Sequence, residues 1–285
     1  MKVVVLGSNG VLGREVVSQI VLRSGWEVFG YDLHELDIRK VEGSDIPDCD
    51  WVVNCAAYTD VNRAEEEVTS AFEVNCCGAG RVARICKSRG IRLLHMSTDY
   101  VFNGEKVLGG EYDEGEDTDP LNAYGMSKLM GEILVRKELP GALIVRTQGL
   151  YGIGGVNFVD KILYRVKGGE GLIKVVGDQY CCPTYVVDLA VGMIKLMELG
   201  EDGVVHISSE GGVSWYEFAK MIIEEVGLSD KVVVQEVSSS EYASKVDRPM
   251  NSVLCKARYT ILTGMEMPGV RDGLSRYIHE LRCKV

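Results

Sequence analysis

A tyrosine and a lysine stand four residues apart in the segment NAYGMSKLMG, as Tyr124 and Lys128. In a helix, residues at this spacing lie one above the other on the same face. An ammonium group that reaches a phenol favours the phenolate, so Lys128 is expected to lower the pKa of Tyr124. Tyr124 then becomes a candidate proton donor and acceptor near neutral pH. The same spacing recurs at Tyr216 and Lys220, so the surrounding sequence has to decide between the two pairs.

The residues upstream of Tyr124 favour the first pair. Thr98 follows the apolar run Arg92–Met96, which predicts a strand, and a hydroxyl at the carboxyl end of a strand can hydrogen-bond a substrate carbonyl. Asn75 lies in a predicted helix of about residues 70–89, where helix propensity and the cost of burying an amide both disfavour it. Asn75 therefore either faces solvent or has a polar partner.

A glycine-rich turn, GSNGVLG, separates the apolar run Lys2–Leu6 from an apolar-periodic segment that ends near Leu22. This pattern predicts strand, tight turn and helix. Gly7 permits the turn, Gly10 lets the backbone approach a pyrophosphate, and Gly13 lets the helix pack closely on the strand. The alternative for such a turn is an ordinary loop, but its place between a first strand and a first helix favours a dinucleotide cofactor.

Asp32 follows the second predicted strand, Glu27–Tyr31, and lies nineteen residues beyond Gly13. A carboxylate at this distance accepts hydrogen bonds from the adenosine ribose and repels a 2′-phosphate. The sequence therefore favours NADH over NADPH, with a plain surface strand end as the alternative. Asp37 and Ile38 are expected to flank the adenine.

The apolar segments predict an α/β fold, a Rossmann-type doubly wound parallel sheet with a smaller, discontinuous C-terminal substrate-binding lobe. Further strands are expected at Trp51–Cys55, Ala142–Thr147 and Val204–Ile207, the last returning to the sheet. We expect residues 1–148 to form the dinucleotide-binding domain, with roughly 184–210 returning to it. Residues 149–183 and 211–285 are expected to form the substrate-binding lobe.

Composition limits the partners and the compartment. The formal net charge of −11 argues against nucleic acid and anionic membranes as partners, and an anionic substrate then needs local cations. No apolar run is long enough for a membrane span or a signal peptide, which predicts a cytoplasmic protein. The nine cysteines include no C-x-x-C pair, and with only four histidines they indicate reduced thiols and no metal site.

Motifs spread over nearly the whole chain point to one family. They are GSNGVLG, VNCAAYTDVNRAE, STDYVFNG, PLNAYGMSK, GDQYCCPT, SWYEFA and RPMNS. With them the chain resembles the extended short-chain dehydrogenase/reductase superfamily, and within it the dTDP-4-dehydrorhamnose reductase family. The resemblance implies reduction of a nucleotide-linked 4-keto-6-deoxy sugar by NADH or NADPH to give dTDP-L-rhamnose. It leaves a homodimer open.

The resemblance also assigns roles to residues of this chain. Tyr124 would protonate the alkoxide at C4, Lys128 would bind the nicotinamide ribose and acidify Tyr124, and Thr98 would polarise the carbonyl. The cofactor-binding residues would be Gly7, Asn9, Gly10, Val11, Leu12, Gly13, Asp32, Asp37, Ile38, Ala57, Tyr58, Thr59, Asn75, Tyr124 and Lys128. The substrate-binding residues would be Val61, Thr98, Asp99, Asn157, Gln179, Arg248 and Asn251. Arg248 would neutralise the diphosphate, with a surface salt bridge as its alternative.

Two positions depart from the family pattern. Gly149 stands where a tryptophan usually packs on the sugar, and Cys181 stands where glycine is usual. Loss of an aromatic platform removes on the order of 1 kcal/mol of binding, so the identity of the sugar stays open. Another nucleotide-sugar epimerase or dehydratase, and a non-catalytic NADP-binding regulatory subunit like the β subunit of methionine adenosyltransferase, remain alternatives.

Overall fold

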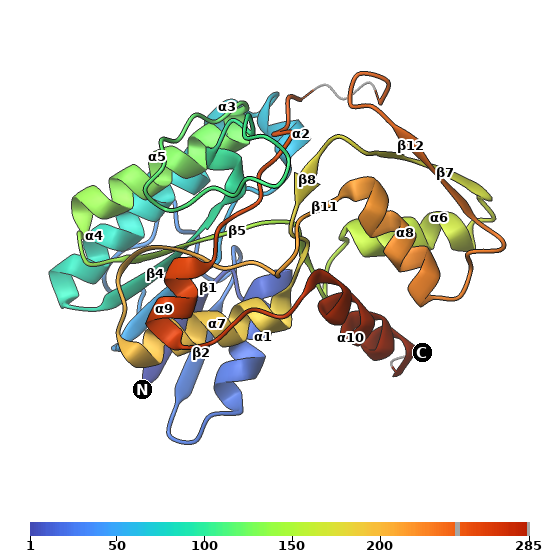
Figure 1. Cartoon of the computed structure of the whole chain (residues 1–285). Coiled ribbons are helices and arrows are strands. Elements are labelled where there is room, and N and C mark those ends of the chain that lie inside the picture. The colour runs from blue at the N-terminus through green and yellow to red at the C-terminus, as the bar shows by residue number, and fades with distance from the viewer. Residues whose placement is uncertain (243–245, 284–285) are drawn as a thin grey trace.

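A six-stranded parallel sheet forms the centre of the computed structural model, which describes residues 1–242 and 246–283 (Figure 1). The strand order is β10-β5-β4-β3-β1-β2. The strands are β1 (Lys2–Leu6), β2 (Glu27–Tyr31), β3 (Trp51–Asn54), β4 (Arg92–Thr98), β5 (Leu143–Thr147) and β10 (Gly203–His206). The chain moves outward in opposite directions from β1 and β3, so the switch point lies between them, where α/β folds bind ligands. The predicted Rossmann-type sheet and the return of the strand near residue 204 are confirmed.

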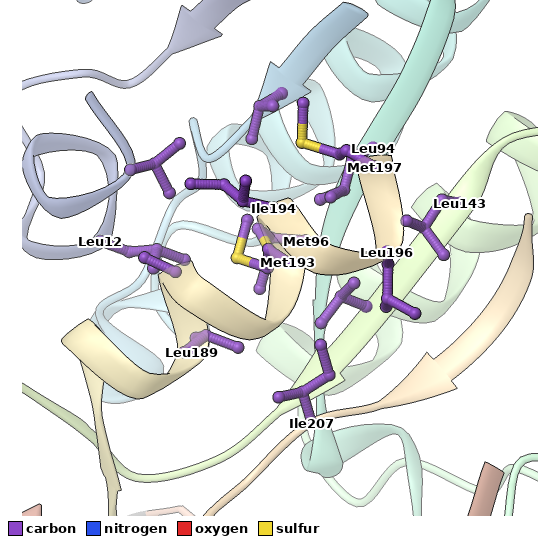
Figure 2. Packing of buried hydrophobic residues seen from close by; sticks show 14 of the residues in the cluster. Leu12, Leu94, Met96, Leu143, Leu189, Met193, Ile194, Leu196, Met197 and Ile207 are labelled. Carbon is purple, nitrogen blue, oxygen red and sulfur yellow. The ribbon is translucent and has the colours of Figure 1, made fainter. Parts of the chain in front are cut away.

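Helices cover both faces of this sheet. The helices α1 (Val11–Val21) and α7 (Val186–Leu199) cover one face, and α4 (Ala79–Arg89) and α5 (Ala123–Glu138) cover the other. Figure 2 shows Met193 of α7 near Met96 of β4, and Leu196 of α7 on the side of Leu143 of β5. The inner strands β1, β3, β4 and β5 are mostly apolar because their alternating side chains enter two separate cores.

A second group of elements lies on the other side of the molecule in Figure 1. Its strand pairs are β7 (Leu172–Val176) with β12 (Val233–Val237), β8 (Tyr180–Cys181) with β11 (Val213–Ser214), and β6 (Leu150–Tyr151) with β9 (Thr184–Tyr185). Its helices are α6 (Phe158–Lys167), α8 (Trp215–Glu225) and α10 (Val270–Cys283), while α9 (Ala257–Thr263) packs on α7. This group has a hydrophobic cluster of its own. That cluster supports the predicted substrate-binding lobe, whose boundaries stay a prediction.

The expected single helix of residues 70–89 is interrupted. It consists of α3 (Val68–Phe72), the π-helical turn η1 (Glu73–Gly78) and α4, and it follows the short helix α2 (Val61–Ala64). Asn75 lies in the π-helical turn with 1% of its surface exposed. Its side-chain oxygen accepts a hydrogen bond from the N–H of Tyr58, and its NH2 group donates to the carbonyl oxygen of Tyr58. The expected polar partner therefore exists. Within the described residues, no helix is long and apolar enough to cross a membrane.

Candidate active site

A cavity of about 1100 Å³ runs along the carboxyl ends of the central strands. It extends from the glycine-rich turn after β1 to Tyr124 on α5. Of the predicted cofactor-binding residues, it is lined by Gly7, Asn9, Gly10, Val11, Leu12, Gly13, Asp32, Asp37, Ile38, Ala57, Tyr58, Thr59, Tyr124 and Lys128. Asn75 does not line it.

The turn after β1 presents the start of a helix to the cavity. Gly10 caps α1 in an extended conformation, and among the described residues no side chain bonds the first N–H groups of the helix as a cap. A Cβ on Gly13 would lie 2.1 Å from the carbonyl oxygen of Gly7, so only glycine lets the helix start this close to the strand. Free N–H groups at a helix N-terminus suit a phosphate group.

Two carboxylates and one guanidinium lie at the far end of the cavity from Tyr124. Asp32 accepts hydrogen bonds from the N–H groups of Asn9 (2.9 Å) and Leu33 (2.7 Å). Arg39 bonds both oxygens of Asp37, with an Nη2–Oδ2 distance of 2.7 Å, and this hydrogen bonding lowers the pKa of Asp37. Arg39 also lines the cavity, and sequence reasoning missed it although it lies two residues after a predicted site residue.

Tyr124, Lys128 and Thr98 converge at the other end. The Asn122 side chain caps α5 by accepting a hydrogen bond from the N–H of Gly125 (2.8 Å), which fixes Tyr124 in the first helical turn. Thr98 ends β4, and its hydroxyl lowers the pKa of Tyr124. Lys128 is 2% exposed, and its ammonium donates to the carbonyl oxygen of Met96 at 2.7 Å. The predicted trio is therefore brought together from β4 and α5.

The pKa shifts differ from the expected acidification of Tyr124 by Lys128. Desolvation raises the pKa of Tyr124 to about 12, against the lowering effect of its hydrogen bond with Thr98, and the charge of Asp99 raises it further. Burial lowers the pKa of Lys128 to about 8, while the charge of Glu132 raises it. Desolvation is therefore the largest cause of the pKa shift of Tyr124. The ammonium group of Lys128 is bonded to the carbonyl oxygen of Met96.

Asp99 is buried next to Thr98. Its Oδ1 accepts a hydrogen bond from the Thr98 hydroxyl (3.0 Å) and its Oδ2 accepts one from the Ser252 hydroxyl (2.6 Å). Only 3% of its surface is exposed, and burial raises its pKa to about 6 although both hydrogen bonds lower it. Sequence reasoning missed Ser252 as a partner, because 153 residues separate it from Asp99.

A second cavity of about 1560 Å³ adjoins the first. Both are lined by Tyr100, Val156, Gln179 and Trp215, which form a neck between them. Arg248 lines the outer cavity and donates to the Asn62 side chain at 2.7 Å. The first cavity is the inner one. It is lined by five further predicted substrate-binding residues, Val61, Thr98, Asp99, Asn157 and Gln179.

Three predicted asparagines use their amides to support the structure. Asn75 bonds Tyr58 and also donates to Ser127 at 2.9 Å, so it holds the strand-end segment that lines the cavity. Asn157 caps α6 and donates to the carbonyl oxygen of Gly152. Asn251 donates to two carbonyl oxygens of the loop at residues 107–110 and lines neither cavity. The expected direct roles of Asn75 and Asn251 in ligand binding therefore have no geometric support.

Gly149 and Cys181, the two departures from the family pattern, both line the inner cavity. Gly149 has φ +57°, and a Cβ there would lie 3.5 Å from the indole of Trp215. An aromatic surface from α8 is therefore present beside the glycine. Cys181 is buried, which raises the pKa of its thiol, and it faces Asp99.

The cavity also contains buried polar atoms that suit a cofactor amide. Thr147 Oγ1 and Gln148 Oε1 are buried and have no hydrogen-bond partner among the described residues. Both residues line the inner cavity at the end of β5. A carboxamide would supply the missing donor and acceptor groups. With the helix start at Gly10, these atoms make the cavity a fit for a nicotinamide dinucleotide.

Comparison with known proteins agrees with this geometry. The family model for the RmlD substrate binding domain matches residues 1–283. A dTDP-4-dehydrorhamnose reductase of Mycobacterium tuberculosis H37Rv is 37% identical over 268 residues, covering 91% of this chain and 86% of that protein. A dTDP-4-keto-6-deoxy-D-glucose reductase of Streptomyces niveus is 40% identical over 258 residues, covering 88% and 87%.

A solved structure is similar over nearly the whole chain. It is the dTDP-4-dehydrorhamnose reductase of Bacillus anthracis str. Ames in complex with NADP, with 35% identity, a TM-score of 0.92, and coverage of 98% of this chain and 99% of that chain. The chain therefore belongs to the RmlD substrate binding domain family, as the resemblance of its motifs to the dTDP-4-dehydrorhamnose reductases predicted.

Proposed function

We propose that this protein uses NADH or NADPH to reduce the C4 keto group of a nucleotide-activated deoxysugar, with dTDP-4-dehydro-L-rhamnose as the preferred substrate. The observation that carries the proposal is the convergence of Thr98, Tyr124 and Lys128 at one end of a cavity that begins at a free helix N-terminus. The Bacillus anthracis relative binds NADP, which supports a nicotinamide cofactor.

The residues divide the chemistry between them. A bound nicotinamide cofactor supplies the hydride to the carbonyl carbon of the sugar. The Tyr124 hydroxyl donates its proton to the alkoxide that forms, as a general acid. Lys128, held by the carbonyl oxygen of Met96, would bind the nicotinamide ribose. Thr98, at the end of β4 in the same cavity, would polarise the carbonyl.

The outer cavity suits the nucleoside diphosphate. Its lining includes Arg63, Lys161 and Arg248, which give an acidic protein the local cations that a diphosphate requires. The sugar would occupy the neck at Trp215, with C4 directed toward Tyr124. The name of the Streptomyces niveus relative favours dTDP-4-keto-6-deoxy-D-glucose as a second candidate substrate.

The test is oxidation of NADH and of NADPH by the purified protein with each of the two ketosugars, followed by ultraviolet absorbance. Tyr124→Phe is expected to abolish turnover. Tyr216→Phe is the matched control, because Tyr216 also precedes a lysine by four residues but lines neither cavity. Full turnover by Tyr124→Phe would refute the assigned mechanism.

The same assay separates the alternative functions. A reductase releases one oxidised cofactor for each sugar reduced, whereas an epimerase or dehydratase regenerates its cofactor within the cycle. Tight cofactor binding without turnover of either sugar would favour a regulatory subunit.

A further inference from the structure

Asp178 and Ser239 lie opposite each other just beyond the ends of two paired strands. The strands β7 and β12 run parallel, and their register aligns Val176 with Val237 (Figure 1). Gly177 continues the pairing, because its N–H donates to the carbonyl oxygen of Val237 at 3.0 Å. Two residues beyond each strand, the same register brings Asp178 to Ser239.

Ser239 uses both its backbone and its side chain to bind the carboxylate of Asp178. Its N–H donates to Oδ2 at 2.8 Å, and its hydroxyl donates to Oδ1 at 2.6 Å. A serine hydroxyl has one hydrogen, and the carboxylate takes it. The oxygen of this hydroxyl can then only accept, so any further partner of Ser239 has to be a donor.

The further partner is the side-chain amide of Gln179. Its NH2 group donates to the hydroxyl oxygen of Ser239 at 2.9 Å. The opposite orientation would place the amide oxygen against a hydroxyl that has no hydrogen left, so the hydrogen-bond network fixes the orientation of the amide. Asp178 thus determines, through Ser239, which way the amide of Gln179 points.

The amide oxygen of Gln179 remains as an acceptor at the neck between the two cavities. Gln179 lines both cavities together with Trp215, although only 8% of its surface is exposed. Its Oε1 bonds no group in the part of the chain that the structure describes, and it is not among the unpartnered side-chain atoms that are fully buried. A ligand in the neck can therefore reach this oxygen.

The position of Gln179 is also fixed through its backbone. Its carbonyl oxygen accepts a hydrogen bond from the N–H of Trp215 at 3.2 Å. Trp215 begins α8, which the Ser214 side chain caps. The neck therefore presents a flat indole and an oriented amide oxygen side by side. An aromatic surface with a few fixed polar groups suits a sugar ring.

We infer that the amide oxygen of Gln179 accepts a hydrogen bond from a hydroxyl group of the sugar ring, and that Asp178 and Ser239 are positioning residues for this contact. The inference rests on the proposed function, in which the sugar occupies the neck and its keto carbon faces Tyr124. In such a sugar, the hydroxyl groups between the nucleotide end and the keto carbon stand on C2 and C3. The protein should therefore select against a sugar that lacks one of these two hydroxyl groups.

The test measures binding, by isothermal titration calorimetry, for dTDP, dTDP-L-rhamnose and the 2-deoxy and 3-deoxy analogues of dTDP-L-rhamnose. The wild type should bind one of the two analogues roughly tenfold more weakly than the parent sugar, as expected for the loss of one hydrogen bond. Gln179→Leu should bind that analogue and the parent equally. All variants should keep the wild-type affinity for dTDP, which shows that they are folded.

Replacing Ser239 tests the positioning role. Ser239→Ala leaves the amide of Gln179 free to rotate, so discrimination between the parent sugar and the analogue should fall to roughly threefold or less. Ser239→Thr keeps a hydroxyl and should restore the wild-type discrimination. Ser240→Ala is the matched control, because Ser240 is an exposed serine of the same loop whose hydroxyl pairs with Ser238.

The possible failures are distinguishable. Equal discrimination by the wild type and Gln179→Leu, or equal affinity of the wild type for all three sugars, would overturn the inference and leave the proposed function standing. Unchanged discrimination in Ser239→Ala would overturn the positioning role. A wild type that binds none of these sugars would refute the proposed function, and this inference with it.

Discussion

Arg146 on β5 and Glu132 on α5 form a two-point ion pair in the protein interior. The Nε–Oε1 distance is 2.8 Å and the Nη2–Oε2 distance is 2.7 Å, and the two side chains are 3% and 0% exposed. Glu132 also accepts a hydrogen bond from Ser97. Glu132 lies one helical turn beyond Lys128, so the ion pair packs next to the active-site lysine. The carboxylate of Glu132 raises the pKa of Lys128.

Replacing Glu132 with alanine is expected to lower the free energy of unfolding by about 3–5 kcal/mol, because the Arg146 guanidinium would remain buried without its partner. Urea unfolding measures the change. Glu138→Ala is the matched control, since Glu138 lies on the same helix but pairs with the exposed side chain of Arg84. Equal stability losses in the two variants would contradict the argument from burial.

Lys128→Met should make the protein more resistant to urea at pH 7 while abolishing turnover. Burial lowers the lysine pKa from 10.5 to about 8, so the unfolded state binds the proton more tightly between these values. The cost of burying the charged Lys128 ammonium lowers the free energy of unfolding in full below pH 8 and no longer does so above pH 10.5. The free energy of unfolding of the wild type therefore rises with pH in this window. The difference between variant and wild type should shrink from pH 8 upward. A difference that does not change with pH would rule out the lysine as its source.

Trp215→Ala is expected to raise KM for the nucleotide sugar roughly fivefold with little change in kcat, because about 1 kcal/mol of stacking is lost in the neck between the cavities. The KM of Trp215→Phe should lie between that of the wild type and that of Trp215→Ala. Trp26→Phe is the control, since Trp26 packs against the core of the central sheet. An unchanged KM in Trp215→Ala would show that the sugar does not reach this indole.

Asp32→Asn should shift the cofactor preference toward NADPH. Its carboxylate lines the cavity where the adenosine ribose is expected, and a negative charge there would repel a 2′-phosphate. Removing that charge should raise the ratio of kcat/KM for NADPH to that for NADH roughly tenfold. Arg39→Ala should move the ratio the opposite way, because Arg39 lines the same end. If both variants keep the wild-type ratio, another group discriminates between the cofactors.

The sequence by itself determined the central fold and most of the cofactor cavity. Continuous apolar runs that end in glycine or small polar residues predict buried parallel strands, and the strand ends of such a sheet meet at one edge. Gly13, Asp32, Thr98 and Tyr124 could therefore be placed together from local pattern alone. The four-residue spacing to Tyr124 added Lys128, and the family motifs added the substrate class.

The tertiary structure decided what each polar side chain bonds. Asn75 and Asn251 were expected to face ligands, but their amides are taken by backbone groups. Ser252 and Arg146 reach Asp99 and Glu132 from distant segments, and sequence spacing contains no signal for such pairs. The pKa of Tyr124 also depends on burial, which is set by packing in three dimensions and not by the lysine four residues away.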